Sequence, residues 1–183
     1  FIQYFDSIYI LVLIMNTVKI LKTSISETSI DEVSKILNTE NSLKVAICNT
    51  NTVVRSHRDG ELNKVINSFD IKTPDGFPIA KSSSILYENN QSRVDGYNVL
   101  IKTIDDGLTS NTSHYFYGSE DSILKKLVLK LKNDFPTINI VGTFSPPKGN
   151  YEELTEEKYI KNIIETKPDI VWVSLGFPKQ ELF

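Results

Sequence analysis

The chain has 183 residues, of which 40% are hydrophobic and 23% charged, so it can bury a sizeable core and is too apolar to be disordered. Its formal net charge is -3, and Lys and Arg are spread along the sequence, which excludes the basic stripe typical of nucleic-acid-binding proteins. The single cysteine, Cys48, excludes an internal disulfide and a cysteine metal cluster, so a cytoplasmic location is expected.

The two ends of the sequence are irregular. Residues 1–14 are apolar but fall short of the roughly 20 residues that cross a bilayer. They also lack the basic start and small-residue cleavage site of a signal peptide. Because a predicted strand follows Met15 directly, we expect Met15 to be the true start and residues 1–14 to be a doubtful extension. The sequence stops at Phe183 inside a predicted helix start, so we expect one domain over residues 15–183 that is truncated at its C-terminus.

Short β-rich runs alternate with helical patterns, which predicts an α/β fold with a mainly parallel, Rossmann-like sheet and helices on both faces. The predicted elements of the first half are a strand over Val18–Leu21, a helix over Ser29–Leu37, a strand over Lys44–Cys48, a helix over Val53–Phe69, a short strand over Ile71–Thr73 with a helix after it, and a helix over Tyr97–Leu108. Ser29 and Glu32 are spaced as a capping box at the first helix.

The second half continues the alternation. Its predicted elements are a strand over His114–Tyr117 closed by Gly118, a helix that Ser119 caps and that runs to Phe135, a strand over Ile138–Gly142, a helix over Thr155–Thr166, and a strand over Ile170–Leu175. The last strand is almost wholly apolar, which predicts burial on both faces. Ligands of such sheets bind at the carboxyl ends of the strands, where Asn49, Asp75 and Gln180 are placed.

Pro74-Asp75-Gly76 has two interpretations. As a turn, proline fixes one φ and glycine accepts a positive one. As a catalytic element, Asp75 is held on a rigid turn at a strand end, where it serves as a general base that takes a proton from an acceptor hydroxyl. On the sequence of the turn alone, the structural interpretation is favoured.

The segment from Gly176 to Glu181 follows the most apolar strand. It is either an ordinary strand-to-helix loop or a helix N-terminus that holds a diphosphate, with the Gln180 amide donating to phosphate or sugar oxygens. Asn49 either caps the next helix or contacts a ligand. Arg93 is either an exposed surface charge or a phosphate partner, because its forked donors suit phosphate.

Several chemistries lack support. The sequence has no G-x-G-x-x-G after its first strand and no Walker-type loop, which excludes the usual dinucleotide and ATP sites. It has no Asp-x-Asp pair to hold a divalent ion on a diphosphate, and the isolated His57 and His114 do not predict a metal site. No cofactor and no metal are therefore expected.

Taken together, these stretches resemble the WecG/TagA/CpsF family, glycosyltransferase family 26, from Val18 to Phe183. The resemblance rests on motifs in order: Val18-Lys19-Ile20-Leu21 with Ile25-Ser26, Asn49, Val53-Val54-Arg55, Asp59-Gly60-Glu61-Leu62, Pro74-Asp75-Gly76, Arg93-Val94 with Gly96, Phe116-Tyr117-Gly118, Phe135-Pro136, Val141-Gly142, Ser145-Pro146-Pro147, Asp169-Ile170-Val171-Trp172-Val173, and Gly176 with Pro178-Lys179-Gln180-Glu181. The last motif and the Pro-Asp-Gly turn are the most specific.

The resemblance implies an inverting, metal-independent transferase of cell-surface polysaccharide synthesis. It would move N-acetylmannosamine or a similar sugar from a UDP donor to N-acetylglucosamine on undecaprenyl diphosphate, at the inner face of the plasma membrane. Asp75 would be the general base. The residues implied to bind substrate are Asn49, Gly76, Arg93, Gly118, Gln180 and Glu181. Nucleic acid is not an expected partner. The sequence leaves the oligomeric state open, although apolar surface exposed by a missing segment would favour a homo-oligomer.

The chain departs from the family pattern at two positions. Ile47 stands where members often have threonine, and Asn98 stands where an aspartate is common. The resemblance also implies a C-terminal segment that closes over the site and reaches the membrane, and we expect the truncated sequence to lack it. A non-catalytic module that binds nucleotide sugars is therefore the alternative function, and an interaction domain with a degenerate site is a weaker third.

Overall fold

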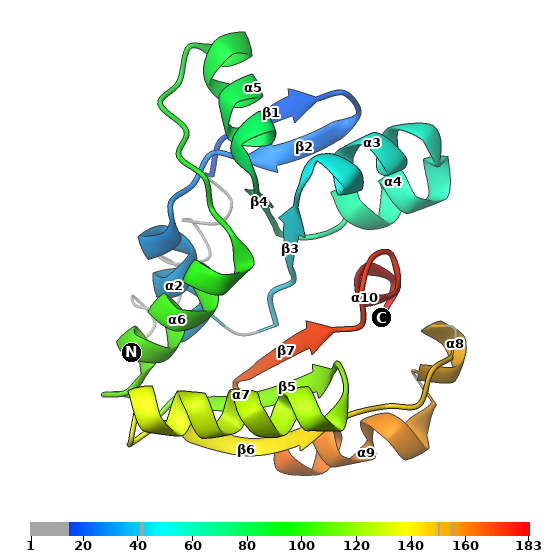
Figure 1. Cartoon of the computed structure of the whole chain (residues 1–183). Coiled ribbons are helices and arrows are strands. Elements are labelled where there is room, and N and C mark those ends of the chain that lie inside the picture. The colour runs from blue at the N-terminus through cyan, green and yellow to red at the C-terminus, as the bar shows by residue number, and fades with distance from the viewer. Residues whose placement is uncertain (1–14, 41, 150, 155) are drawn as a thin grey trace, which may run out of the picture. The chain divides into compact units, whose positions relative to one another are not determined.

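A computed structural model of the chain describes residues 15–40, 42–149, 151–154 and 156–183. In these ranges strands alternate with helices along the chain (Figure 1), which confirms the predicted α/β class. The chain divides into two compact units, one ending at Asp106 and one running from Gly107 to Phe183. The doubtful extension at residues 1–14 lies outside the described residues, and the prediction of one domain over residues 15–183 stays a prediction.

The first unit holds two pairs of strands. β1 (Thr17–Ile20) and β2 (Thr23–Ser26) form an antiparallel hairpin, whereas β3 (Val45–Cys48) and β4 (Ile71–Pro74) pair in parallel. The sequence predicted β1 but missed β2, three of whose four residues are polar. Tertiary contacts satisfy those hydroxyl groups, because the buried Ser26 Oγ accepts a hydrogen bond from Lys72 N at 3.1 Å.

The helices of the first unit are α2 (Ile30–Thr39), α3 (Thr50–Arg58), α4 (Gly60–Asn67), α5 (Phe77–Tyr87) and α6 (Gly96–Gly107). The capping box of Ser29 and Glu32 is confirmed. The single helix predicted over Val53–Phe69 is wrong, because the chain breaks at Asp59. The Asp59 carboxylate accepts hydrogen bonds from Glu61 N and Leu62 N, both at 3.0 Å, and so starts a second helix.

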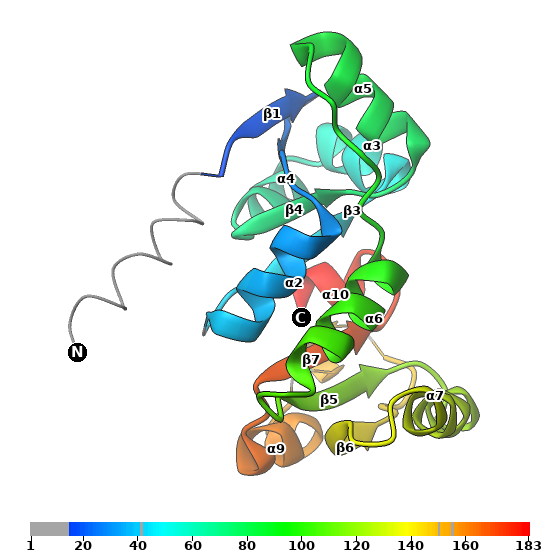
Figure 2. The same ribbon diagram turned by 90° about the vertical axis from the view of Figure 1, so that its left-hand side faces the viewer.

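The second unit contains a parallel three-stranded sheet in the order β6-β5-β7. Its elements are β5 (Ser113–Gly118), α7 (Asp121–Asp134), β6 (Asn139–Phe144), α8 (Tyr151–Leu154), α9 (Glu157–Thr166), β7 (Ile170–Ser174) and α10 (Lys179–Leu182). Helices α7 and α9 lie on opposite sides of this sheet (Figure 2), as the Rossmann-like prediction requires.

Two local predictions for the second unit are wrong. Ser119 does not cap α7, since it has a positive φ of 64° and Glu120 takes the cap position. Strand β7 is not buried on both faces: Ile170 is buried, but the next three residues are half-buried and Ser174 is exposed. β7 pairs with β5 alone among the described strands, so it forms an edge of its sheet. The predicted start of α9 at Thr155 falls outside the described residues.

Aromatic side chains build the core of the second unit. Tyr115 and Tyr117 are fully buried on the central strand, and their hydroxyl groups donate to Asn162 Oδ1 (3.0 Å) and to the Leu154 carbonyl (2.7 Å). Burial raises the pKa of Tyr117 to about 12, so both phenols stay neutral hydrogen-bond donors. In the part of the chain that the structure describes, no helix combines the length and the apolar content needed to cross a bilayer.

Candidate functional site

Asp75 stands on a turn that backbone hydrogen bonds hold at the carboxyl end of β4. Its N–H donates to the carbonyls of Cys48 (3.1 Å) and Thr73 (3.0 Å), so the turn is tied to the neighbouring strand as well as to its own. Gly76 follows with a φ of 84°, a conformation that suits glycine, and α5 begins at the next residue. The position of the carboxylate is thus set by the sheet rather than by a free loop.

Arg93 makes an ion pair with this carboxylate. Its Nε donates to Asp75 Oδ1 at 3.1 Å, and the backbone beside it is anchored because Val94 N donates to the Pro74 carbonyl at 3.1 Å. The Arg93 side chain is 58% exposed and the Asp75 side chain 19% exposed. The sequence offered only a surface charge or a phosphate partner for Arg93. The structure adds a third role, which is to orient Asp75 through a charge-assisted hydrogen bond.

Asp95 is a second carboxylate of this cluster that sequence reasoning missed. It is buried, accepts hydrogen bonds from Asn98 N (3.1 Å) and Asn98 Nδ2 (2.7 Å), and lies 3.9 Å from Arg93 Nε. Burial acts to raise the pKa of Asp95, but the Asn98 hydrogen bonds and the Arg93 charge outweigh it and lower the pKa below its ordinary value. The signal for this contact was the spacing of Asp95 and Asn98 at a helix start, which resembles a helix cap.

Asn49 lies next to Asp75 in the parallel pair. Cys48 of β3 is in register with Pro74 of β4, so Asn49 and Asp75 each follow a paired residue at the same sheet end. Asn49 Oδ1 accepts a hydrogen bond from Thr52 N at 3.1 Å and caps α3, which bears out the structural interpretation of this residue. The first unit therefore brings Asn49, Asp75, Gly76 and Arg93 together.

The structure places the other predicted site residues, Gly118, Gln180 and Glu181, in the second unit. Gly118 ends β5 with a φ of 109°, and a Cβ atom there would lie 2.3 Å from the Ser174 carbonyl oxygen at the end of β7. The same carbonyl accepts a hydrogen bond from Ser119 N at 2.7 Å. Gly118 therefore allows the ends of the two strands to approach closely, immediately before the loop that leads to Gln180.

Both the oxygen and the nitrogen of the Gln180 side-chain amide are hydrogen-bonded. Its Oε1 accepts a hydrogen bond from Gly176 N at 3.2 Å, and its Nε2 donates to Glu181 Oε1 at 3.1 Å. Glu181 is buried, and its second oxygen has no hydrogen-bond partner among the described residues. Burial raises the pKa of Glu181 and outweighs the hydrogen bond from Gln180, which acts to lower it.

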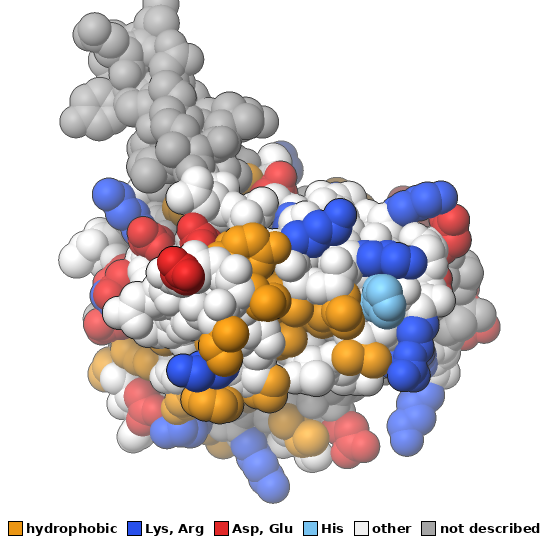
Figure 3. All heavy atoms as spheres, turned by 90° about the horizontal axis from the view of Figure 1, so that it is seen from above, with side chains coloured by type: hydrophobic (Ala, Val, Ile, Leu, Met, Phe, Trp, Pro, Cys, Tyr) orange, Lys and Arg blue, Asp and Glu red, His pale blue; other side chains and the backbone are white. Residues whose placement is uncertain are grey.

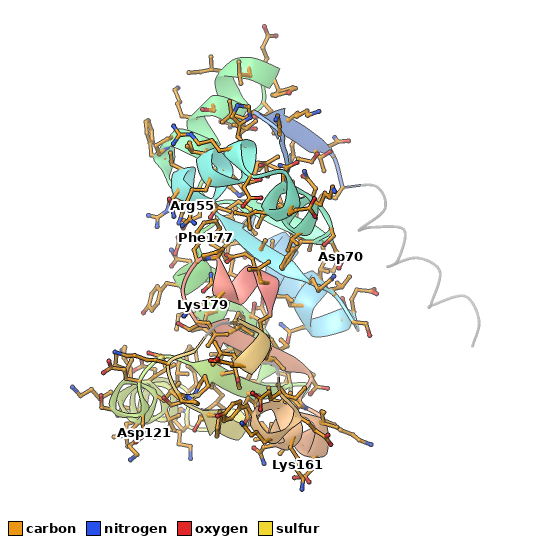
Figure 4. The ribbon with its side chains drawn as sticks, turned by 90° about the vertical axis from the view of Figure 1, so that its right-hand side faces the viewer. Arg55, Asp70, Asp121, Lys161, Phe177 and Lys179 are labelled. Carbon is orange, nitrogen blue, oxygen red and sulfur yellow. The ribbon has the colours of Figure 1, made fainter. Side chains whose placement is uncertain are left out.

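The helix N-terminus that the sequence suggested for a diphosphate is one turn long. The N–H groups of Gln180, Glu181 and Leu182 donate to carbonyls of the preceding loop at 3.2 Å. Phe177 and Lys179 flank the cap residue Pro178 (Figure 4), and Lys179 Nζ donates to the Gly149 carbonyl at 2.6 Å. Many of the hydrogen-bond donors of this segment are therefore already paired within the second unit.

The two histidines lie in different surroundings. His57 is exposed on α3. His114 is buried, its Nδ1 accepts a hydrogen bond from Trp172 Nε1 at 3.2 Å, and burial lowers its pKa to about 4. Across the described residues, no three His, Cys, Asp or Glu side chains gather in a group that could hold a metal ion.

An α/β protein with polar side chains at the carboxyl ends of parallel strands belongs to a class whose members bind ligands at those ends. Residues 15–183 match the Glycosyl transferase WecG/TagA/CpsF family, and the chain belongs to that family.

Two curated relatives carry the same name, N-acetylglucosaminyldiphosphoundecaprenol N-acetyl-beta-D-mannosaminyltransferase. The protein from Bacillus spizizenii is 29% identical over 119 residues, which are 65% of this chain and 44% of the relative. The protein from Bacillus subtilis is 29% identical over 126 residues, which are 69% of this chain and 47% of the relative. The chain thus spans about half the length of the curated relatives it matches.

Proposed function

We propose that the chain is the acceptor-activating part of a glycosyltransferase in which Asp75 is the general base. The donor would be a UDP-linked N-acetylmannosamine or a similar sugar, and the acceptor would be N-acetylglucosamine on undecaprenyl diphosphate. One observation carries the proposal: the Asp75 carboxylate is fixed at a strand end by the backbone of two strands and by Arg93. The names of the two Bacillus relatives support the choice of acceptor and sugar.

The proposed step is a single displacement at the anomeric carbon. The acceptor hydroxyl oxygen forms a bond to that carbon while the bond to the donor diphosphate breaks, UDP leaves, and the configuration inverts. Arg93 Nε binds Asp75 Oδ1, so Oδ2 is the oxygen that would receive the hydroxyl proton. The ion pair would keep the carboxylate pointed at the acceptor, which contributes through orientation.

The charge of the leaving diphosphate must also be neutralised. Arg93 uses its Nε on Asp75, and its side chain is more than half exposed, so its terminal amino groups are the proposed contact to a phosphate oxygen. The sequence has no Asp-x-Asp pair, and we therefore propose a reaction without a divalent ion. Asn49 would contribute its amide nitrogen, because the helix cap uses its carbonyl oxygen. In the second unit, Gln180 and Glu181 are proposed to contact the donor.

A second candidate function is binding of a nucleotide sugar without catalysis. It is favoured by the side chain of Gln180, both ends of which are already hydrogen-bonded within the second unit. Turnover by the protein would exclude this candidate. Binding of UDP with no turnover from any donor would favour it.

The test is UDP release by the purified protein with a panel of UDP sugars and a short lipid-diphosphate acceptor, with and without EDTA. Asp75→Asn is compared with Asp105→Asn, which changes an exposed aspartate of α6 in the same way. We expect turnover in EDTA, a loss of about 100-fold to 10,000-fold in Asp75→Asn, and little change in Asp105→Asn. Equal rates in the two variants would contradict the role of Asp75.

A further inference from the structure

Helix α5 and the β1–β2 hairpin expose a group of large hydrophobic side chains. The exposed fractions are 73% for Phe77, 65% for Ile85, 63% for Leu86, 52% for Leu21 and 45% for Tyr87. These five make up more than half of the exposed large hydrophobic side chains in the described part of the chain. We call them, with Lys19, Lys22 and Lys81, the α5 surface. Figure 3 shows hydrophobic side chains gathered on this face of the first unit, with basic and acidic groups around them.

The two elements of the α5 surface are joined to each other. Phe77, Lys81 and Ile85 follow at intervals of four residues, so they share one face of α5. At the end of the helix, Tyr87 Oη accepts a hydrogen bond from Lys19 N (3.0 Å) and donates to the Lys19 carbonyl (2.8 Å) on β1. All of these residues belong to the first unit.

The charge of the α5 surface differs from that of the chain. Residues 17–26 contain Lys19 and Lys22, residues 77–87 contain Lys81, and neither segment contains an acidic residue. The 183 residues together carry a formal net charge of -3. Hydrophobic side chains carried on segments whose charged residues are all lysines are a pattern of proteins that lie on anionic membranes. Acidic side chains flank the face at one end in Figure 3, and Glu88, the exposed C-cap residue of α5, directly follows Tyr87.

The α5 surface begins at the proposed catalytic turn. Phe77, its most exposed hydrophobic residue, directly follows Gly76 and stands two residues after Asp75. A surface that holds the bilayer next to Asp75 would bring a lipid-linked hydroxyl to the base without extracting the lipid from the membrane.

We propose that the α5 surface docks on a bilayer that contains anionic phospholipids. The choice of a bilayer rests on the proposed function, whose acceptor is carried by a membrane lipid. Phe77, Ile85 and Leu86 would enter the boundary between headgroups and acyl chains, and the three lysines would contact lipid phosphates. A second copy of the chain fits less well, because a two-fold contact would press the three lysines of one copy against those of the other.

The test is sedimentation of the purified chain with vesicles of phosphatidylcholine alone and of phosphatidylcholine mixed with phosphatidylglycerol, both free of acceptor lipid. We expect binding to the mixed vesicles that weakens in high salt. The double variant Phe77→Ser/Ile85→Ser should bind about tenfold more weakly or worse. Lys81→Glu should weaken binding to the mixed vesicles only. The matched control is Leu129→Ser, which removes a 70% exposed leucine from α7 and should bind like wild type.

The outcomes separate this inference from the proposed function, because the vesicles contain neither donor nor acceptor. Circular dichroism of each variant checks that the fold is kept. Failure of the wild type to bind, or equal binding by Phe77→Ser/Ile85→Ser and Leu129→Ser, overturns the α5 surface as a membrane contact. A wild-type dimer that Phe77→Ser/Ile85→Ser converts to a monomer assigns the surface to a second copy and also overturns it. Vesicle binding without UDP release would leave the inference standing and remove the proposed function.

Discussion

The same three residues, glycine, phenylalanine and proline, follow a parallel strand in each unit, yet the two turns they form differ. Gly76-Phe77-Pro78 follows β4 and Gly176-Phe177-Pro178 follows β7, and both glycines have a positive φ, of 84° and 78°. In the first turn Gly76 caps a helix of 11 residues and Phe77 is exposed. In the second, Phe177 is half-buried, the Phe177–Pro178 peptide bond is cis, and the helix has four residues.

The carboxylates beside the two turns differ as well. Asp75 stands before its glycine, reaches solvent in part and is bound by Arg93. Glu181 stands after its proline, is buried, and has one oxygen without a hydrogen-bond partner among the described residues. A guanidinium faces the carboxylate beside the first turn, whereas burial raises the pKa of the carboxyl beside the second. We infer that similar local sequences can serve different chemistry once the surroundings differ.

Exchanging each carboxylate for its amide gives the largest expected contrast. In UDP release, Asp75→Asn should lose at least about 100-fold in turnover, since an amide cannot accept the acceptor proton. Glu181→Gln should lose less than about tenfold, because glutamine resembles the neutral carboxyl and can still accept the hydrogen bond from Gln180. An equally deep loss in Glu181→Gln would break the distinction between the two turns.

The glycines of the second unit should differ in what they cost to replace. Gly118→Ala should destabilise the second unit by about 3 kcal/mol, because the new Cβ would meet the Ser174 carbonyl as well as an unfavourable φ. Gly176→Ala should destabilise the second unit by about 1 kcal/mol. The new Cβ atom would meet nothing within 4 Å, so the substitution adds only backbone strain. Urea unfolding followed by the fluorescence of Trp172, the single tryptophan, measures both. Equal costs would show that the close approach of β5 and β7 is not maintained.

Burial of His114 should make the second unit sensitive to acid. The pKa of His114 is about 4 in the fold against 6.5 when exposed, so the unfolded chain takes up a proton first as the pH falls. Stability from this group is therefore complete above pH 6.5 and is lost between there and pH 4, by about 2 kcal/mol from pH 7 to pH 5.

His114→Gln should remove this loss of stability between pH 7 and pH 5. His57→Gln, at an exposed position, should keep it. Glu181 acts in the opposite sense. Its raised pKa means that its contribution is present below the ordinary glutamate pKa and is lost as the pH rises through the folded value. The quantity to compare is therefore the difference between wild type and each variant at pH 7 and pH 5. If His114→Gln lost as much stability between pH 7 and pH 5 as wild type, His114 would not be the source of the loss.

Local sequence signals predicted much of the fold because they act within a few residues. The alternation of strands and helices, the capping box of Ser29 and Glu32, and the cap formed by Asn49 all follow from short-range hydrogen bonds and periodicity. The same signals failed where a distant contact decided the outcome. β2 forms because its buried hydroxyls find partners on other elements, and β7 is half-exposed because of its edge position in the sheet.

The same distinction between local signals and distant contacts applies to the candidate site. The sequence by itself determined that Asp75 stands on a rigid turn after a strand, because proline and glycine restrict the backbone wherever they occur. Only the tertiary structure decided that Arg93, eighteen residues further on, binds that carboxylate, and that Glu181 is buried. The reason is physical: backbone preferences belong to the residue and its neighbours, whereas ion pairs and burial depend on which segments the fold brings together.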